Sequence, residues 1–285
     1  MTTAAVVSDA GYSTEKTVIK PRKGFAHLDF GELWRFRDLL YLLTLRSIKI
    51  RYKQSVLGVA WALIKPFVQM IVFSVFIGTL LGVGRRVDVP YPIFLYAGLL
   101  PWLFFQSTVT TSTHSLVQNA AMMRKVYFPR ILMPLATIGA PLMDYLIGFT
   151  LLGGLMWYYG VALTPQLLLV IPLILTTVIA GIGIGIFCSA WTAIYRDVGF
   201  LVPYFVQLMF YATPVMYPGS IVGPEYADLL TLNPMYGTIS TFRACIFGDP
   251  IDFHAWSMSV KFALLFLILG VVMFHRLERR LADVI

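Results

Sequence analysis

The residues that could perform chemistry in this sequence are few, and most of them lie inside apolar stretches. Ser112, His114 and Ser115 include a nucleophile and a base, but nucleophilic catalysis also needs a third group that orients the base. No acid lies near these three residues in the sequence. We therefore interpret them as polar side chains of a helix rather than as a hydrolytic site.

One carboxylate, that of Asp144, lies well inside an apolar stretch. An ionisable residue at membrane depth is costly unless it is paired, so Asp144 is a candidate functional residue. The alternative is a structural pair with a nearby Arg or Lys, and Arg130 lies only 14 residues earlier. The sequence leaves both roles open. A proton-relay pump usually has a chain of such carboxylates, so a single one disfavours secondary transport.

Nucleotide and metal chemistry have no sequence support in this chain. The phosphate-binding pattern G-x-x-x-x-G-K-[ST] does not occur, so we expect no ATP hydrolysis of that kind by this chain alone. Gly181 and Gly185 lie inside an apolar run at the spacing that favours close helix packing. Cys188 and Cys245 form neither a disulfide framework nor a metal-ligand spacing. We predict no catalytic residue, no metal site and no cofactor bound by this chain.

The elements that must position these residues are membrane-spanning helices. Hydrophobic residues make up 58% of the 285 residues and charged residues 13%, against about 45–50% and about 25% in soluble chains. A spanning helix needs roughly 20 apolar residues. Such stretches lie at 58–81, 93–118, 135–159, 167–193, 198–217 and 256–275. The sequence therefore predicts an all-α polytopic membrane protein with six transmembrane helices.

The distribution of Lys and Arg predicts the orientation of these helices. Eighteen of the 22 Lys and Arg residues fall on one side, in residues 1–65, in alternate connections and in the C-terminal tail. The positive-inside rule places this side in the cytoplasm, and with it both termini. Because the basic residues lie at the ends and in short connections, the net charge of +8 does not indicate nucleic-acid binding.

Three divisions of the chain follow from this pattern. Residues 1–30 are polar and irregular, and we expect a mobile cytoplasmic tail. Residues 31–56 predict an amphipathic helix in the membrane interface, because several charged residues share one arc of the helix opposite Leu and aromatic residues. A cytosolic helix packed on protein is the alternative. Residues 57–285 form the six-helix transmembrane domain.

The connection of residues 218–254, on the predicted outer side, is too long for a simple turn. Pro-Gly, Gly-Pro and Asn-Pro pairs divide it, and 225–232 and 235–247 are long enough for two short helices. Arg243 stands in an otherwise apolar part of the second. We predict short re-entrant helices that enter the outer leaflet before the last span.

Polar and aromatic residues mark a candidate substrate path. Nine polar residues within 106–115 of the second span point in every direction, so this helix is buried in protein or borders a wet cavity. Phe105, Tyr204 and Tyr211 are the aromatic residues that we select for a carbohydrate path, with core packing as the alternative. If they only pack, the path lies on the first span, around Trp61, Phe67 and Phe73.

Several segments resemble one known family, the membrane subunits of bacterial ABC-2 type polysaccharide exporters. The resemblance covers nearly all of residues 32–280, in order. The segments that carry it are 48–66 (IKIRYKQSVLGVAWALIKP), 116–130 (LVQNAAMMRKVYFPR), 195–198 (YRDV), 212–217 (ATPVMY) and 232–247 (LNPMYGTISTFRACIF).

This resemblance implies a function and partners. Family members export O-antigen, capsular polysaccharide or teichoic acid chains, usually attached to a lipid diphosphate, across the bacterial inner membrane. They act as a dimer of two permease copies with two separate ATPase subunits, which bind the ATP. The missing phosphate loop is then expected in this chain.

Two groups of residues acquire roles from the resemblance. Residues 119–130 resemble the coupling loop that docks on the ATPase, and its apolar and basic side chains suit an interface. The coupling residues would be Arg124, Lys125, Tyr127, Phe128 and Arg130. The basic helix resembles a gate helix at the cytosolic membrane surface, where its cations would meet lipid phosphates or the carrier diphosphate. Ordinary attraction to anionic lipid explains the same residues, Arg46, Lys49, Arg51 and Lys53.

The leading hypothesis is a permease subunit of an ATP-driven polysaccharide exporter. A drug or small-lipid exporter of the same ABC-2 type is the alternative within transport, and it would need a lipophilic pocket more than an aromatic-lined tunnel. A polytopic glycosyltransferase or acyltransferase is the alternative from another class. That hypothesis is weakened because no acid pair or His-acid motif lies at either membrane face.

Overall fold

The computed structural model describes residues 30–53 and 57–284, and every regular element in these two ranges is a helix. The predicted tail of residues 1–30 lies almost wholly outside the described residues. The α-helices are α1 (Phe30–Arg35), α2 (Arg37–Lys53), α3 (Trp61–Phe73), α4 (Tyr91–Gln118), α5 (Ala120–Met123), α6 (Leu132–Ala136), α7 (Gly139–Tyr158), α8 (Val170–Ile194), α9 (Val198–Ala212), α10 (Ala227–Thr231), α11 (Tyr236–Phe247) and α12 (Phe253–Val284). The remaining helical segments are the π-helix η2 (Ser74–Leu80) and the 3₁₀ helices η1 (Gly58–Ala60), η3 (Val83–Arg86), η4 (Pro165–Leu169), η5 (Gly219–Ile221) and η6 (Pro224–Tyr226).

Helix α4 is the centre of the bundle. It packs against α3, α7, α8, α9 and α11, and most of its side chains are buried. It starts after Pro90, with a second proline in its first turn, where a missing backbone N–H removes no helical hydrogen bond. Trp102 and Phe105 pack against one another near its middle with their ring planes tilted by 51°, and Trp102 also packs on Phe210 of α9. The polar band of the second span thus belongs to the most buried of the five candidate spans in the described residues.

Helices α8 and α12 touch along their backbones. A side chain at Gly183 of α8 would meet the backbone of Leu267, and one at Gly270 of α12 would meet the carbonyl oxygen of Gly183. Gly181 and Gly185 face α4 instead, against Thr108 and Ser112. The interpretation of these glycines as packing residues is therefore confirmed, because each lets a neighbouring helix approach closely.

Five of the expected spans are long and apolar enough to cross a membrane within the described residues. They are Gly58–Leu80, Tyr91–Gln118, Leu132–Tyr158, Pro165–Ile194 and Phe253–Glu278. The remaining stretch, 198–217, is shorter than expected: α9 has 15 residues and ends at Ala212. Pro214 explains this end, because the residue before a proline avoids the helical region, and Thr213 is extended. A sixth span stays a prediction.

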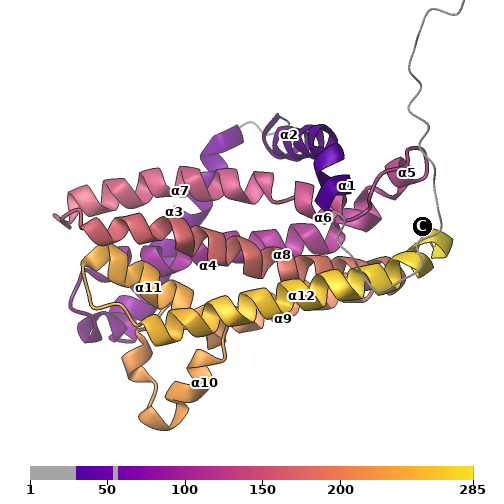
Figure 1. The fold of residues 1–285 in the computed structure, drawn as a ribbon. Helices are drawn as coiled ribbons and strands as arrows, with labels where there is room; N and C mark the ends of the chain where they lie inside the picture. Colours follow the sequence, from indigo (N-terminus) through magenta and orange to yellow (C-terminus); the bar gives the residue numbers. More distant parts are fainter. Residues whose placement is uncertain (1–29, 54–56, 285) are drawn as a thin grey trace, which may run out of the picture.

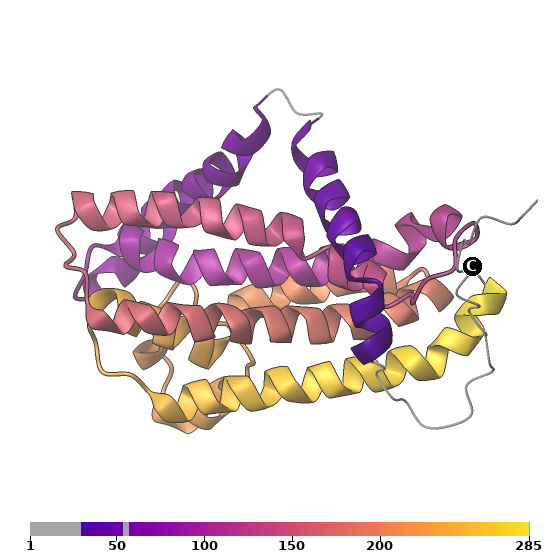
Figure 2. The same ribbon diagram turned by 45° about the horizontal axis from the view of Figure 1, so that its top comes forward.

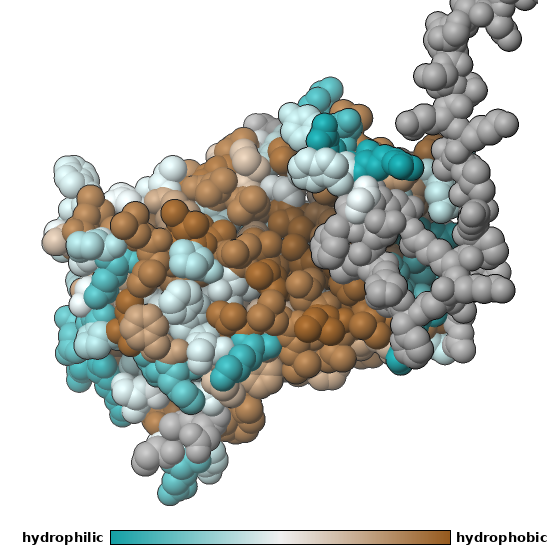
Figure 3. Space-filling model, viewed as in Figure 1, coloured by the Kyte–Doolittle hydropathy of each residue, from teal (hydrophilic) through white to brown (hydrophobic). Residues whose placement is uncertain are grey.

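The two ends of the bundle differ. The long helices run side by side in Figure 1, with α2 and α5 near one end and α10 and α11 near the other. Figure 2 shows α2 inclined steeply to the long helices. On the face in Figure 3, hydrophobic residues cover the middle and hydrophilic residues gather toward the ends. This arrangement agrees with an interfacial α2, whose membrane contact stays a prediction.

The connection of 218–254 contains helices where they are expected. Helix α10 lies within predicted segment 225–232, and α11 lies within predicted segment 235–247. Helix α11 ends at Gly248, whose φ of 80° is the left-handed conformation of a helix C-terminus. Nine residues of α11 are buried, against α4, α8 and α12. Entry of this helix into the bilayer stays a prediction.

Candidate functional site

A cavity of about 840 Å³ opens between α2, α3, α4 and α7. Its volume lies in the range of small-molecule sites, about 300–1,000 Å³. Charged, polar and aromatic side chains from all four helices line it together. The lining includes Arg51, Tyr52, Trp61, Lys65, Gln69, Phe104, Gln106, Ser107, Thr110, Thr111, Asp144 and Tyr145.

The polar band of α4 forms one wall of this cavity. Gln106, Ser107, Thr110 and Thr111 line it. The buried hydroxyls of Thr113 and Ser115 donate to backbone carbonyl oxygens of the same helix, at 2.8 Å and 2.7 Å, whereas the buried hydroxyl of Thr108 has no partner among the described residues. Both expectations for the band are therefore confirmed: part of it is buried in protein and part borders a polar cavity.

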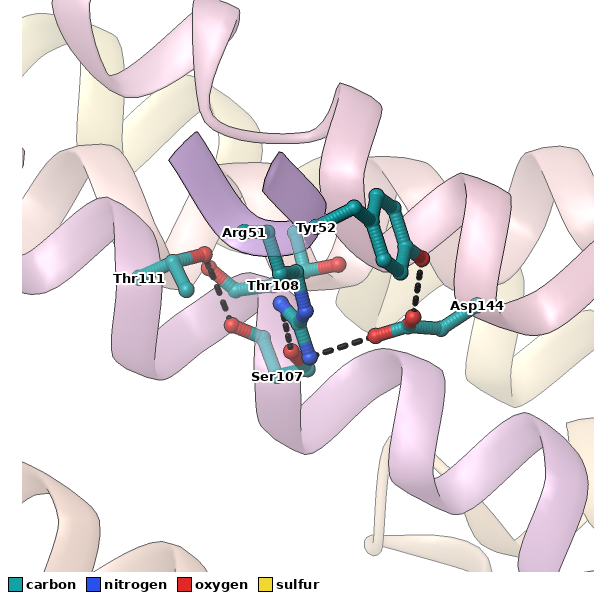
Figure 4. Close-up of polar contacts among 6 residues, drawn as sticks. All are labelled: Arg51, Tyr52, Ser107, Thr108, Thr111 and Asp144. Carbon is teal, nitrogen blue, oxygen red and sulfur yellow. Dashed lines mark hydrogen bonds and ion pairs between the residues drawn. The ribbon is translucent and has the colours of Figure 1, made fainter. Parts of the chain in front are cut away.

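Four side chains that line this cavity form a network (Figure 4). Asp144 of α7 forms an ion pair with Arg51 through one carboxylate oxygen. Its other carboxylate oxygen accepts a hydrogen bond from the Tyr52 hydroxyl. Arg51 Nη1 also lies 3.4 Å from the Ser107 hydroxyl of α4. The network joins α2 to both α4 and α7.

The Tyr52 hydroxyl is fixed as a donor in this network. Burial raises the pKa of Tyr52, and its hydrogen bond to Asp144 raises the pKa further. The structural pairing of Asp144 with a basic residue is confirmed. Its partner is Arg51 of α2 and not Arg130, which donates instead to the carbonyl oxygen of Glu278 at 3.2 Å.

Helix α2 also packs closely on α7 and on α6, the short helix before it. A side chain at Gly139, the first residue of α7, would meet the methyl of Thr44. The Ser47 hydroxyl lies 3.2 Å from the carbonyl oxygen of Ala136. The absence of a side chain at Gly139 therefore sets how closely α2 approaches.

The four residues of α2 that are predicted to meet lipid phosphates lie in different surroundings in the structure. Arg51 alone of them lines the cavity. Arg46 is exposed and lies with its Nη1 3.4 Å from the sulfur of Met122, while Lys49 and Lys53 are exposed. The contact of Arg46 with Met122 links α2 to α5. The predicted gate helix and the predicted coupling loop are thus neighbours.

Only some of the apolar side chains of the predicted coupling loop, residues 119–130, are exposed on the surface of the chain. Lys125, Val126 and Tyr127 are exposed, with Tyr127 at 65%. Phe128 is only 5% exposed and packs in a core cluster with Leu132. The expectation that Phe128 offers an anchor to a partner is wrong for this structure, because its own chain buries the ring. Arg124 is exposed in the same turn.

The predicted aromatic path divides into exposed and buried residues. Tyr204 and Tyr211 are more than half exposed, and together with Phe200 and Leu208 they occupy one face of α9. Phe105 is buried against Trp102, so it cannot meet a polymer on the surface of this chain. Its selection as a path residue is therefore corrected. On the first span, Trp61 and Phe67 are exposed, while Phe73 packs on Phe210 at 5.8 Å between ring centres.

At the other end of the bundle, Arg243 of α11 is buried without a carboxylate partner among the described residues. Its guanidinium donates to the carbonyl oxygens of Phe94, Pro214 and Val215, and its central carbon lies 3.7 Å from the Phe94 ring centre. Two of these carbonyls, those of Pro214 and Val215, lie just after the end of α9, and the third lies in the first turn of α4. A smaller cavity of about 350 Å³ adjoins this residue.

Four polar cavity residues are not among the predicted site residues: Tyr52 of α2, and Lys65, Gln69 and Tyr145 in apolar stretches. A charge inside a span, such as Lys65, is a sequence signal for function. Within the described ranges no group of three or more His, Cys, Asp or Glu residues could hold a metal ion. The cavity lining itself supplies charged and hydrogen-bonding side chains.

The sequence is similar to known transport proteins. The family described as ABC-2 type transporter matches residues 38–247. An O-antigen export system permease protein RfbA of Klebsiella pneumoniae is 30% identical over 253 residues, 87% of this chain and 95% of that protein. A protein of the same name from Myxococcus xanthus is 29% identical over 219 residues, 76% of this chain and 83% of the relative. The polysialic acid transport protein KpsM of Escherichia coli is 22% identical over 245 residues, 83% of this chain and 92% of the relative.

Proposed function

This chain belongs to the ABC-2 type transporter family, and from that premise we propose that it is the membrane permease subunit of an ATP-driven polysaccharide exporter. The observation that carries the proposal is its similarity, over most of both chains, to proteins named for O-antigen export and polysialic acid transport. The substrate is a polysaccharide or a lipid-linked glycan that crosses the bacterial inner membrane. Five apolar helices supply the membrane domain.

ATP hydrolysis in this proposal belongs to a separate subunit. That subunit binds the ATP, and it docks on the exposed turn of Lys125, Val126 and Tyr127 next to α5. Movement there reaches α2 through the contact of Arg46 with Met122. The turn and both chain termini then face the cytoplasm, as the Lys and Arg distribution favours.

Two copies of this chain enclose the path in the proposal. The exposed aromatic face of α9, with Tyr204 and Tyr211, supports this arrangement because aromatic rings stack on sugar rings wherever along the polymer they meet. Individually weak and repeated contacts let a polymer advance stepwise. A deep pocket would hold each sugar in place.

Reconstitution tests the proposal. The purified chain is expected to hydrolyse no ATP alone and to form a complex with an ABC ATPase subunit encoded beside it. A strain that lacks the chain should accumulate polysaccharide inside the cell, and the chain supplied in trans should restore the surface polymer. Normal surface polysaccharide in the deletion strain, together with efflux of a small drug or lipid by the complex, would favour the small-molecule exporter instead.

A further inference from the structure

A second cavity, of about 350 Å³, lies at the end of the bundle that holds α11, away from α5 (Figure 1). Its lining comes from five separate segments: the loop before α4, the first turn of α4, the segment after α9, α11 itself and the turn that follows α11. The volume falls in the lower part of the range for small-molecule sites, about 300–1,000 Å³. The aromatic residues of α9 do not belong to this lining, so the cavity is separate from the proposed polymer path.

One member of the lining, Arg243, is a buried cation. It is 8% exposed and has no carboxylate partner among the described residues. Bonds to three backbone carbonyl oxygens and contact with the Phe94 ring hold its guanidinium in place. A guanidinium has more N–H donors than these three bonds use. The cavity therefore has a positive group that is already fixed, which lowers the entropic cost of binding a ligand.

The charges of the side chains in this lining cancel one another. Arg86 and Arg243 are the cations, and Asp88 and Asp249 are the anions. Arg86 and both aspartates are exposed, and none of the three forms an ion pair within residues 30–53 and 57–284. Donors and acceptors of hydrogen bonds thus line the same cavity, and its net charge favours neither an anion nor a cation.

Three hydroxyl groups of the lining are also uncommitted. The side chains of Ser220, Tyr236 and Ser240 form no hydrogen bond to any described residue. A Cβ atom at Gly219 would lie 3.1 Å from the Tyr236 hydroxyl, so this glycine leaves the room that the tyrosine ring occupies. The end of α11 positions Asp249, whose backbone N–H donates to a carbonyl oxygen of that helix at 3.1 Å. The fold therefore places polar groups around this cavity and leaves them available to a ligand.

We infer that this cavity binds one sugar unit of a glycan. The hydroxyl groups of a sugar both donate and accept hydrogen bonds, so they can pair with the guanidinium, carboxylate and hydroxyl groups of the lining. The C–H face of a sugar ring can pack on an aromatic ring, and the partly buried Phe247 supplies one. A small anion would use the cations but would be repelled by the two carboxylates. An apolar ligand would leave the polar lining unpaired.

This inference rests on the proposed function for the source of the sugar. If the end with α11 is the outer side, as the Lys and Arg distribution favours, the sugar unit belongs to polymer that has already crossed the membrane. A unit held there would oppose backward sliding of the polymer. Binding to the isolated permease needs no ATPase subunit, so the two proposals can fail separately. Loss of export in the deletion strain without sugar binding removes this inference alone, and sugar binding with normal export in that strain removes the proposed function alone.

Equilibrium binding to the full chain in phosphatidylcholine nanodiscs tests the inference. The probe is a set of fluorescently end-labelled oligosaccharides from partial acid hydrolysis of the surface polysaccharide of the strain that encodes the chain. Ser220→Trp places a large side chain at an exposed edge of the cavity and should weaken probe binding about tenfold or more. Gly223→Trp, in the same connection with nothing within 4 Å of its position, is the matched control and should bind as the wild type does. Equal binding by the two variants, or no binding by the wild type, would overturn the inference.

Smaller substitutions test the hydrogen-bonding groups one at a time and leave the structural Arg243 in place. Tyr236→Phe and Ser240→Ala each remove one hydroxyl and should weaken binding about fivefold. Asp249→Asn should weaken it about tenfold, because a charged acceptor is lost. Ser257→Ala is the control, since its hydroxyl bonds to a backbone carbonyl oxygen of α12 outside the cavity. Wild-type affinity in all three folded cavity variants would contradict the inference.

Two competing explanations are tested on the same protein. The double variant Tyr204→Ala with Tyr211→Ala should bind the probe as the wild type does, because neither residue lines the cavity. Loss of binding in this variant, with normal binding by Ser220→Trp, would place the sugar on α9 and overturn the inference. Sulfate should displace the probe poorly. Displacement by sulfate as effective as that by unlabelled oligosaccharide would show a site for anions and would also overturn it.

Discussion

The guanidinium of Arg243 lies over the ring of Phe94, with its central carbon 3.7 Å from the ring centre. The same group donates to the carbonyl oxygens of Phe94, Pro214 and Val215. It thereby fastens the end of α9 and the start of α4 to α11. One cation of the connection between α9 and α12 thus determines how three elements meet at this end of the bundle.

Arg243→Met is expected to destabilise the chain by about 3 kcal/mol, because buried carbonyl oxygens lose their donor. Arg243→Lys should be intermediate, since an ammonium keeps the charge but not the planar set of donors. Denaturant unfolding of the purified chain in detergent measures both. The exposed Arg85→Met is the matched control and should have little effect. Equal stability of the Arg243→Met and Arg85→Met proteins would contradict this role.

A larger residue at Gly139 is expected to separate α2 from α7. Gly139→Val places atoms where the methyl of Thr44 lies, so α2 must shift. Labelling of Ser47→Cys by a water-soluble maleimide should then rise several-fold, and both native cysteines are buried and should react slowly. Gly154→Val on the same helix is the control, because nothing lies within 4 Å of its position. The same labelling in both backgrounds would show that α2 does not depend on Gly139.

Substitutions of Tyr127 and Phe128 are expected to have different effects, the first on binding of the ATPase subunit and the second on the stability of this chain. Tyr127→Ala should weaken association with the ATPase subunit by about 2 kcal/mol, because an exposed aromatic anchor is lost. Phe128→Ala should instead lower the stability of this chain by about 3 kcal/mol, since its ring is buried in its own core. Pull-down of the complex and unfolding of the isolated chain measure the two effects. Tyr158→Ala, exposed at the far end of α7, should change neither. A Tyr127→Ala complex of wild-type strength would remove the docking assignment.

Alanine at Tyr204 or Tyr211 is expected to slow polymer export modestly. The double variant should slow it more than additively if both rings meet the same polymer. Phe105→Ala should act differently, lowering stability by about 3 kcal/mol because the ring packs on Trp102. Surface polysaccharide in a pulse experiment and protein level in the membrane provide the two readouts. Trp157→Ala, on the exposed face of α7, is the control. Normal export by the double variant would show that these tyrosines have another role.

Cysteine labelling of intact cells tests the orientation of the chain. An impermeant maleimide added from outside is expected to reach Asp249→Cys readily, because this residue is exposed. It should reach Ile246→Cys poorly, because that position is buried in α11. Tyr127→Cys should react only after the cells are opened. Labelling of Tyr127→Cys in intact cells would reverse the proposed orientation and move the ATPase site to another surface.

Much of the fold follows from local sequence. Length and apolar content located five spans, and the proline and glycine pairs located α10 and α11. The difference at α9, which ends at Ala212 and not at residue 217, also has a local cause. Pro214 is a helix-ending signal that lies inside the apolar run 198–217. Hydropathy alone does not register that signal.

The contacts of the candidate site could not be read from local sequence. Arg130 is the basic residue nearer in sequence to Asp144, yet Arg51 pairs with it because α2 folds back across α7. Phe128 has the composition of an interface residue, and only the position of α6 shows that its own chain covers it. Lys65 and Tyr145 become neighbours of this site through packing of α3 and α7, which no spacing within either helix reveals.

The backbone contact between α8 and α12 has a mechanical consequence. With no side chain between Gly183 and Gly270 to rearrange, sliding of one helix past the other would drive backbone into backbone. Sliding of these two helices past one another is therefore disfavoured, whereas the Gly58–Leu80 span, with 11% of its apolar window buried, is packed less tightly on the rest of the described chain. In the proposed exporter, a force applied by the ATPase subunit near α5 would act through α2 on this less tightly packed side of the bundle.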